Sequence, residues 1–204
     1  MTGLRARQKA NRNKQIVTSA SGLFRKTGFE NTKIETIAER AEVSVGTIYN
    51  YFESKGDLLV AVVSLEVNEV LNAGESVIAA PPDDVMEAIT LLIDIYLDHS
   101  LYYLDKDMWR NAMALATSQP TSPSGRKYNE LDERLSAQVG ELIEKLRRMG
   151  RIKANTDTEA VGGIIFNATN MMFTTFVKTD TMSLEKLKSA LARQIKPLAE
   201  AIRI

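Results

Sequence analysis

Side chains suited to contacting nucleic acid are concentrated in one stretch of this chain, between Thr32 and Leu59. The stretch carries hydroxyl, amide and ammonium groups at Ser44, Thr47, Tyr49, Asn50, Tyr51 and Lys55. Groups of this kind bind the phosphate oxygens and the base edges of duplex DNA. They can act together only if local structure presents them on one surface, so the elements around them decide the interpretation.

Catalytic chemistry has little support in the same sequence. The chain has no cysteine and a single histidine, His99, which excludes thiolate metal sites and sites built from several histidines. Glycine-rich phosphate loops and the serine motif G-x-S-x-G do not occur in it. Asp94 and Asp98 are spaced i,i+4, which here favours a solvated helix face over an acid–base pair. We therefore predict no catalytic residue, no cofactor and no metal site.

Three helix-start signals surround the polar side chains. Thr32 and Glu35 form a T-x-x-E capping box, Ser44 is a second N-cap candidate, and Ser54 with Asp57 repeats the signature. Apolar residues at helical spacing follow the first two signals, at Ile34, Ile37, Ala38, Ala41, Val45, Ile48 and Phe52. Helix, four-residue turn and helix is the spacing of a helix-turn-helix, whose second helix can enter the major groove.

The order of residues in this stretch is more specific than a generic helix-turn-helix. It runs Ile37-Ala38-Glu39-Arg40-Ala41, Val43-Ser44, Gly46-Thr47-Ile48-Tyr49, Tyr51-Phe52 and Ser54-Lys55. This order resembles the N-terminal domain of the TetR family of bacterial repressors, over roughly residues 11–60. The remainder fits that family only in length and helical character. Glu42 and Gly56 depart from the family pattern, and a left-handed backbone at Glu42 would cost about 1 kcal/mol.

The second helix of the motif, about Val45 to Tyr51, is the one expected to read DNA. Gly46 would let the backbone approach the duplex, Thr47 would meet base edges or a thymine methyl, and Lys55 would meet a phosphate. The resemblance implies the same roles, although the two tyrosines could instead pack in the core. The candidate DNA-binding residues are Thr32, Lys33, Ser44, Val45, Gly46, Thr47, Tyr49, Asn50, Tyr51 and Lys55.

The charge distribution separates a basic head from an acidic body. Residues 1–55 carry ten basic and five acidic side chains, so this segment is +5 although the whole chain is neutral. No acidic residue precedes Glu30. Such a segment suits a phosphate-binding surface, and the alternative is a solvated helix face. Residues 1–10 lack an apolar stripe and are predicted to be a flexible basic arm, which either reaches DNA or frays in solvent.

Apolar periodicity predicts an all-α fold of about nine helices. A helix from about Asn11 to Thr27 would end at Gly28 and bury Ile16, Ala20, Leu23 and Phe24. Further helices are predicted at about 54–79, 83–101, 105–118, 124–149 and 158–177, with a last helix from 183 that Pro197 should kink or split. We predict a three-helix DNA-binding head with the helix-turn-helix, residues 1–53, and a helical regulatory and dimerisation body, residues 54–204.

A ligand cavity in the body is predicted from aromatic and methionine side chains accompanied by a few polar groups. The candidates are Tyr96, His99, Tyr103, Met108, Trp109, Met113, Phe166, Asn167 and Asn170. Asn167 and Asn170 lie in an otherwise apolar helix, and a buried amide requires a partner. That partner is a ligand, the facing subunit or another side chain, and plain core packing is the alternative for the aromatic candidates.

The last two helices offer more apolar surface than a chain of this size needs to bury internally. The first of them is apolar on nearly every side, which is typical of a helix buried all round. Ordinary core packing is one interpretation, and a homodimer interface, which the resemblance also implies, is the other. The candidate interface residues are Val161, Ile165, Met172, Leu187, Leu191 and Ile195.

These observations predict a ligand-responsive transcriptional regulator, most simply a cytoplasmic repressor that binds a near-palindromic DNA operator as a homodimer and is released by a small-molecule effector. The alternatives are a transcriptional activator and a sequence-tolerant architectural DNA-binding protein. No apolar run reaches the eighteen residues or more of a membrane span, so no membrane partner is expected.

Overall fold

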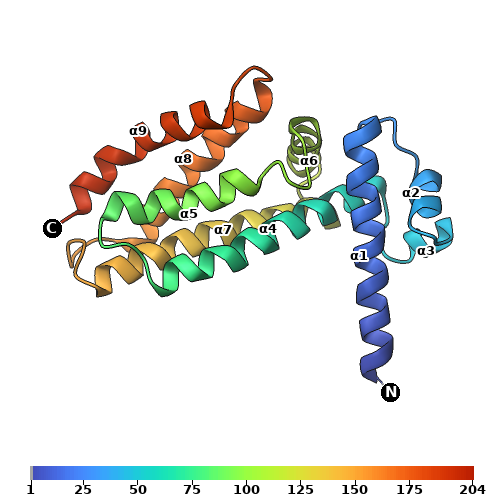
Figure 1. Cartoon of the computed structure of the whole chain (residues 1–204), viewed down its shortest axis with the longest axis horizontal. Helices are drawn as coiled ribbons and strands as arrows, with labels where there is room; N and C mark the ends of the chain where they lie inside the picture. The colour runs from blue at the N-terminus through green and yellow to red at the C-terminus, as the bar shows by residue number, and fades with distance from the viewer. Residues whose placement is uncertain (1) are drawn as a thin grey trace. The chain divides into compact units, whose positions relative to one another are not determined.

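The computed structural model describes residues 2–204, except for the side chains of Thr2, Leu4 and Arg5. Within that range it has helices and no strand (Figure 1). The helices are α1 (Thr2–Thr27), α2 (Ile34–Arg40), α3 (Val45–Tyr49), α4 (Lys55–Ala79), α5 (Val85–His99), α6 (Lys106–Ser118), α7 (Pro123–Arg148), α8 (Thr158–Lys178) and α9 (Leu184–Ile202). The all-α prediction is confirmed, and the predicted bounds from residue 54 onward agree with the observed ones to within two residues.

Contacts divide the chain into two compact units. The first comprises the described residues up to Leu65 together with Tyr102–Asn129, and the second comprises Glu66–Leu101 with Glu130–Ile204. Helix α6 and the start of α7 therefore belong to the same unit as the helix-turn-helix, and a Cβ on Gly56 would lie 3.2 Å from Leu115 Cδ1 of α6. The functional boundary predicted after residue 53 stays a prediction, because these units are defined by packing alone.

The first unit is built on the apolar stripe of α1. Ile16, Ala20, Leu23 and Phe24 are all buried, as predicted. Gly28 ends the helix with a positive φ of 81°, a conformation that glycine adopts without steric cost. Phe29 then turns inward, and its ring meets that of Phe24 edge-on with centroids 5.2 Å apart.

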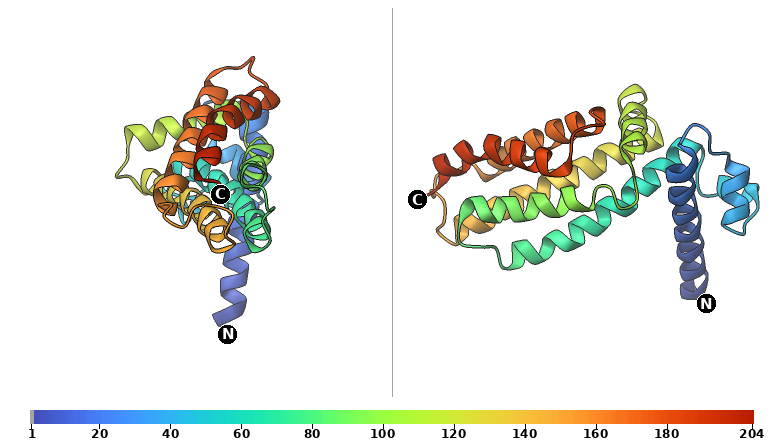
Figure 2. Two further views of the ribbon diagram at one scale, coloured as in Figure 1. Left: turned by 90° about the vertical axis from the view of Figure 1, so that its left-hand side faces the viewer. Right: turned by 45° about the horizontal axis from the view of Figure 1, so that its top comes forward.

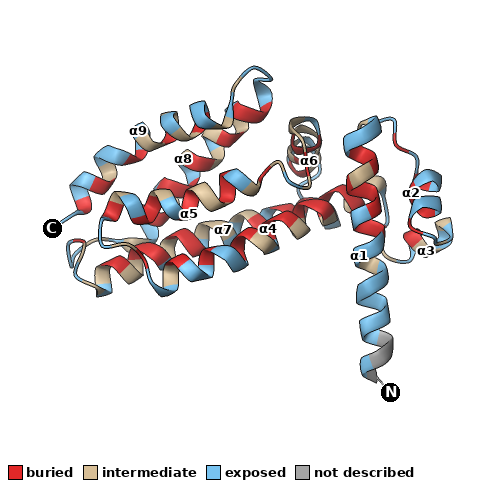
Figure 3. Ribbon diagram, viewed as in Figure 1, coloured by how far each residue is buried: buried red, intermediate tan, exposed pale blue. Residues whose placement is uncertain are grey.

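The predicted flexible arm is instead the first part of α1. Helix α1 begins at Thr2, about nine residues earlier than the apolar stripe indicated. Ala, Arg, Gln and Lys between residues 5 and 15 are good helix formers, and a helix already nucleated by the buried stripe propagates into them at little cost. The described side chains of residues 3–15 are exposed except Asn13, which is half-buried (Figure 3).

The turn between α2 and α3 shows one feature that the sequence had left open and one correction. Glu42 adopts a positive φ of 52°, the left-handed conformation expected at the usual glycine position of the turn. Thr32 does not cap α2, because the N-cap residue is Lys33 and it makes no side-chain capping bond. Thr32 is buried instead, and its hydroxyl donates to the Gly28 carbonyl at 2.7 Å.

Helices α5, α8 and α9 belong to the second unit, where α9 packs against both α8 and α5 (Figure 2). Helix α7 approaches α8 very closely, since a Cβ on Gly162 would stand 2.6 Å from the Gly140 Cα. Pro197 does not split α9, which is continuous to Ile202. This proline lies on the exposed side of the helix, where water can satisfy the carbonyl that it leaves without a donor.

Helix α8 is the one helix among the described residues that is long and apolar enough to cross a membrane by length and composition. This is weak support for a membrane span, because the core helices of soluble proteins pass the same test. Its apolar character was predicted to make it buried on all sides. One face of α8 is in fact exposed, at Ile164, Asn167 and Met171.

Candidate DNA-binding surface and effector site

Helix α3 is the second helix of the motif, which is expected to read DNA and is called the reading helix below. Its N-terminus is capped by a serine hydroxyl. Ser44 Oγ accepts a hydrogen bond from the Thr47 amide at 3.0 Å, which satisfies one of the free N–H groups at the helix start. Ile48 is buried against the head and fixes the rotation of the short helix. The opposite side is therefore turned to solvent, where Ser44, Gly46, Tyr49 and Asn50 are exposed.

Two of the predicted contact residues are partly engaged within this surface. The Thr47 hydroxyl lies 2.8 Å from Ser44 Oγ, so it takes part in the cap. A Cβ on Gly46 would meet nothing closer than Ser44 Oγ at 3.8 Å, so no intramolecular crowding requires glycine there.

The two tyrosines of the motif differ in orientation. Tyr49 is 53% exposed, so its ring stands in solvent on the reading side. Tyr51 is half-buried, and its hydroxyl donates to the Lys9 carbonyl of α1 at 3.4 Å. The Lys9 ammonium lies 5.8 Å from the centre of the Tyr51 ring. Tyr51 thus connects the residues just after α3 to the first part of α1.

Thr32 and Lys55 are engaged inside the protein rather than presented to a duplex. Lys55 Nζ donates to the carbonyls of Phe29, Glu30 and Thr32 at 2.8, 2.9 and 3.3 Å. These three bonds use all the donors of an ammonium group. The buried Thr32 side chain is equally unsuited to a DNA contact. Lys33, by contrast, is exposed.

Helix α4 begins with the predicted capping pair. Ser54 Oγ accepts from the Asp57 amide at 3.1 Å and donates to the Asp57 carboxylate at 3.0 Å. Lys55 follows the cap directly, so the start of α4 and the loop after α1 are held together within the first unit. The reading helix is therefore attached to a helix that continues into the second unit.

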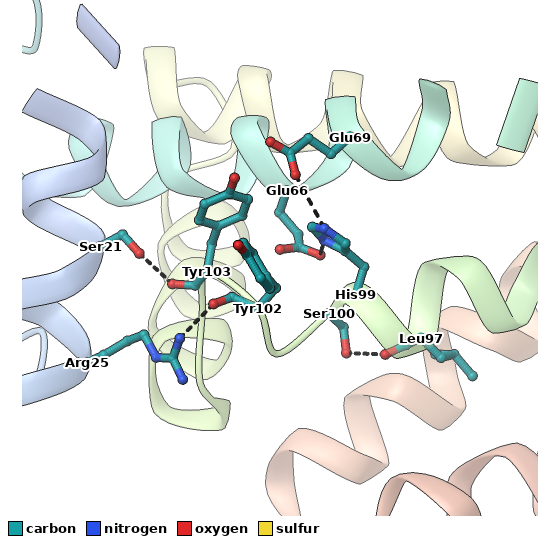
Figure 4. Close-up of polar contacts among 9 residues, drawn as sticks. All are labelled: Ser21, Arg25, Glu66, Glu69, Leu97, His99, Ser100, Tyr102 and Tyr103. Carbon is teal, nitrogen blue, oxygen red and sulfur yellow. Dashed lines mark hydrogen bonds and ion pairs between the residues drawn. The ribbon is translucent and has the colours of Figure 1, made fainter. Parts of the chain in front are cut away.

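The predicted effector residues are divided between the two units. Tyr103, Met108, Trp109 and Met113 belong to the first unit, where Met108 and Trp109 are buried. In that unit the carbonyls of Tyr103 and Tyr102 accept hydrogen bonds from Ser21 at 2.7 Å and Arg25 at 2.6 Å, both from α1 (Figure 4). The other candidates, Tyr96, His99, Phe166, Asn167 and Asn170, belong to the second unit.

Buried polar groups surround the second-unit candidates. Tyr96 is buried, and its hydroxyl donates to Gln138 Oε1 at 2.6 Å, while burial raises the pKa of that hydroxyl. His99 lies between two carboxylates of α4, with Nδ1 2.6 Å from Glu66 Oε1 and Nε2 3.3 Å from Glu69 Oε2 (Figure 4).

The two asparagines of α8 do not share one environment. Asn170 Nδ2 donates to Asp132 Oδ2 of α7 at 3.3 Å, so its partner is another side chain. Burial raises the pKa of Asp132 to about 6, and the hydrogen bond from Asn170 opposes that shift. Asn167 is exposed, so the prediction that it is a buried amide is wrong. Asn167 and Asn170 lie on either side of the edge of the packed face of α8, and their i,i+3 spacing alone did not show this.

Glu66 and Gln138 were missed by the sequence reasoning. Both are polar residues in apolar stripes: Glu66 falls between Val63 and Val70 on α4, and Gln138 between Leu131 and Leu142 on α7. Both are buried, and Gln138 Nε2 also donates to the Leu71 carbonyl at 2.8 Å. A polar residue in register with an apolar stripe is the signal that would have found them.

Five of the six predicted interface residues are packed within the chain. Val161, Ile165, Leu187, Leu191 and Ile195 are buried among the helices of their own unit, so their side chains have little surface to offer a partner. Met172 is half-buried, and its Sδ accepts from Gln194 Nε2 at 3.2 Å. The large apolar side chains of α8 that remain in solvent are Ile164, 55% exposed, and Met171, 67% exposed.

Comparison with known proteins bears on the same region. Residues 16–62 match the family described as bacterial regulatory proteins, tetR family, which covers the buried stripe of α1, the helix-turn-helix and the start of α4. Residues 16–62 therefore carry a domain of the TetR family. The capped helix α3 lies inside this TetR-family domain, at the second helix of its helix-turn-helix.

Two curated relatives and one solved structure extend the comparison beyond the head. The transcriptional repressor KstR of Rhodococcus jostii is 29% identical over 151 residues, spanning 72% of this chain but only 61% of the repressor, less than two thirds of its length. The fatty acid metabolism regulator protein of Bacillus subtilis is 26% identical, over 85% of this chain and 88% of that protein. Thermus thermophilus FadR, solved with lauroyl-CoA, has a TM-score of 0.69 at 20% identity, covering 94% of this chain and 95% of FadR.

Proposed function

We propose that this chain is a transcriptional repressor that binds a near-palindromic operator as a homodimer and is released by a small-molecule effector. The observation that carries the proposal is the capped reading helix, which turns the polar side chains of Tyr49 and Asn50 to solvent within a segment, residues 1–55, of net charge +5. KstR and FadR are named as repressors, which supports repression over activation. We also propose that the protein acts in the cytoplasm and is not an enzyme.

The candidate residues of the head that are not engaged inside the protein each have a proposed DNA contact. The Asn50 amide and the Thr47 methyl group are suited to base edges, while the hydroxyls of Ser44 and Tyr49 and the exposed Lys33 are suited to phosphate oxygens. Val45 and Gly46 allow the backbone to approach. Thr32 and Lys55 are omitted from the proposed contacts, because both are engaged by the loop after α1.

A dimer is proposed because two reading helices must be held one helical turn of DNA apart, about 34 Å or a multiple of it. The exposed face of α8, with Ile164 and Met171, replaces the buried residues of the original prediction as the proposed contact surface. Helix α9, which packs beside α8, supplies the rest of the surface.

The proposed effector is a long-chain acyl-CoA. Two relatives support this class: one is named a fatty acid metabolism regulator, and the other was solved with lauroyl-CoA. In this chain the second unit combines apolar Phe166 with hydrogen-bonding groups on Tyr96, His99 and Asn170. Helix α4 carries Glu66 and Glu69, which hold His99, and begins at the Ser54 cap next to the reading segment. An effector that displaces His99 would therefore act on the helix that bears the head.

Selection from random duplexes, followed by binding measurements on the selected site, tests the DNA-binding claim. We expect the selected site to be near-palindromic. Asn50→Ala should reduce the discrimination between the preferred base and the other bases at the position that Asn50 contacts by about 1–3 kcal/mol. Asn72→Ala, an exposed asparagine of α4 in the second unit, is the matched control and should bind like the wild type. Equal affinity for all duplexes would exclude a sequence-specific repressor.

The effector claim is tested by titrating the operator complex with lauroyl-CoA, with free CoA and lauric acid as controls. A typical coupling of about 1–3 kcal/mol corresponds to a fall in operator affinity of roughly 5- to 150-fold. Only the intact thioester should produce it. If acyl-CoAs of several chain lengths leave the affinity unchanged, the effector class is wrong, whereas the DNA-binding claim stands on the first experiment.

A further inference from the structure

The first part of α1, residues 3–15, is a helix without a packed face. Among its described side chains none is buried, and Ile16 is the first residue of the apolar stripe. Its helical state depends on propagation from the buried part of α1, because the segment has no packed apolar face of its own. A partner that covers it would therefore stabilise it considerably.

The charges of this segment oppose helix formation. Its described charged side chains, Arg7, Lys9, Arg12 and Lys14, are all basic, and the first turn of α1 contains no acidic residue. Lys9 and Arg12 are spaced i,i+3, so their like charges are neighbours on the helix surface and repel one another. A pattern that costs stability locally and carries one sign of charge indicates a polyanionic partner.

The segment is anchored beside the reading helix. The Lys9 carbonyl accepts from the Tyr51 hydroxyl, and the Lys9 ammonium lies 5.8 Å from the centre of the Tyr51 ring. Tyr51 follows the last residue of α3, Tyr49, by two positions. At about 100° per residue, Arg12 lies within roughly 60° of Lys9 around the helix, whereas Arg7 and Lys14 lie on the opposite side.

Building on the proposed function, we propose that this segment is a second DNA-binding element, in which Lys9 and Arg12 contact phosphates flanking the bases read by α3. Thirteen residues of α helix extend about 20 Å, roughly the length of six base pairs. These contacts are independent of sequence, so they add affinity and salt dependence without changing which bases are preferred. A membrane surface with anionic lipid is the alternative polyanionic partner. Removing the two basic residues on the Tyr51 side, Lys9 and Arg12, distinguishes DNA from lipid.

Two double variants with the same change of charge test the proposal. Lys9→Gln with Arg12→Gln removes the pair on the Tyr51 side, and Arg7→Gln with Lys14→Gln removes the pair on the other side. Glutamine is a good helix former, and all four side chains are exposed, so both variants should fold as the wild type does by circular dichroism. The affinity for duplex DNA is then measured as a function of salt concentration.

We expect the Lys9/Arg12 variant to lower the slope of log affinity against log salt by about 1.8, and the Arg7/Lys14 variant to lower it by less than half as much. Base preference in a random-duplex selection should be the same in all three proteins. Equal losses in the two variants would show a diffuse field without docking, and no loss in either would show that the segment does not touch DNA. Both results overturn the proposal.

The same titration on a duplex of unrelated sequence separates this proposal from the proposed function. Phosphate contacts persist on any duplex, so the difference between the two variants should remain there even if no operator exists. Vesicles containing phosphatidylglycerol are the lipid arm of the experiment. If the two variants differ in vesicle binding and not in DNA binding, the partner is a membrane surface and the proposal is wrong.

Discussion

Lys55 and Phe29 form a close contact at the start of α4, where the Lys55 ammonium donates to the Phe29 carbonyl at 2.8 Å and stands 4.6 Å from the centre of the Phe29 ring. The same ammonium also binds the Glu30 and Thr32 carbonyls. A residue that the sequence motif assigned to DNA phosphate thus closes the loop between α1 and α2.

Replacing Lys55 by methionine should therefore lower stability more than it lowers salt-dependent DNA affinity. Charge-assisted hydrogen bonds contribute about 1.5–3 kcal/mol each in favourable cases, and we expect a total loss of about 1–3 kcal/mol in urea unfolding because water reaches the freed carbonyls. The salt slope of DNA binding, measured where the variant is fully folded, should be unchanged. Lys33→Met is the control and should lower the slope by about one without loss of stability. If Lys55→Met instead kept its stability and lowered the salt slope, Lys55 would be a DNA phosphate contact.

The carboxyl group of Asp132 should make stability fall as the pH rises. Its pKa is about 6 in the folded protein against 3.8 for the unperturbed group, so folding favours the protonated form. The stabilisation is complete below about pH 4 and is lost as pH rises through 6, a change of about 3 kcal/mol. Asp132→Asn should remove this dependence, which urea unfolding at pH 4.5 and 7.5 measures as a difference from the wild type. Glu133→Gln, on an exposed neighbour, should leave it in place. Parallel pH profiles for wild type and Asp132→Asn would refute it.

The crossing of α7 and α8 should not tolerate a methyl group. The Cβ of Gly162→Ala would lie 2.6 Å from the Gly140 Cα, a backbone atom that can move only if the helices separate. We expect a loss of about 1–3 kcal/mol in thermal or urea unfolding. The neighbouring Gly163 meets nothing within 4 Å, so Gly163→Ala should be neutral or stabilise by up to about 1 kcal/mol through helix propensity. Similar effects at both positions would show that α7 and α8 are not packed this closely.

Met171→Asp should dissociate the proposed dimer while leaving the protomer folded. The side chain is 67% exposed, so the charge stays in water in the monomer but would be buried unpaired in a dimer. Leu91→Asp, at an exposed apolar residue of α5, is the control and should remain dimeric by sedimentation. Leu191→Asp is expected to unfold the protein, because Leu191 is 2% exposed within its own unit. A dimeric Met171→Asp would place the interface elsewhere.

The helices and their ends were determined largely by the sequence itself. Ser44, Ser54 and Gly28 act through bonds and backbone angles within a few residues, so their types predict the caps of α3 and α4 and the end of α1. The left-handed conformation of Glu42 was not predicted, although the sequence marked this position as the usual glycine of the turn. The apolar stripe also predicted which side of α1 is buried, because burial follows helical period, but the apolar pattern of α8 hid its exposed face.

Only the tertiary structure decided which partner each polar side chain takes. Lys55 binds carbonyls 23 to 26 residues away, Glu66 binds His99 across 33 residues, and Asn170 binds Asp132 while Asn167 stays in water. The type of a polar residue states that it requires a hydrogen bond or water. Its partner can be DNA, a ligand, a second subunit or a group of its own chain. Helix packing decides this, because it determines which distant groups come within hydrogen-bond distance, about 3 Å. The order of residues in the sequence does not contain that distance.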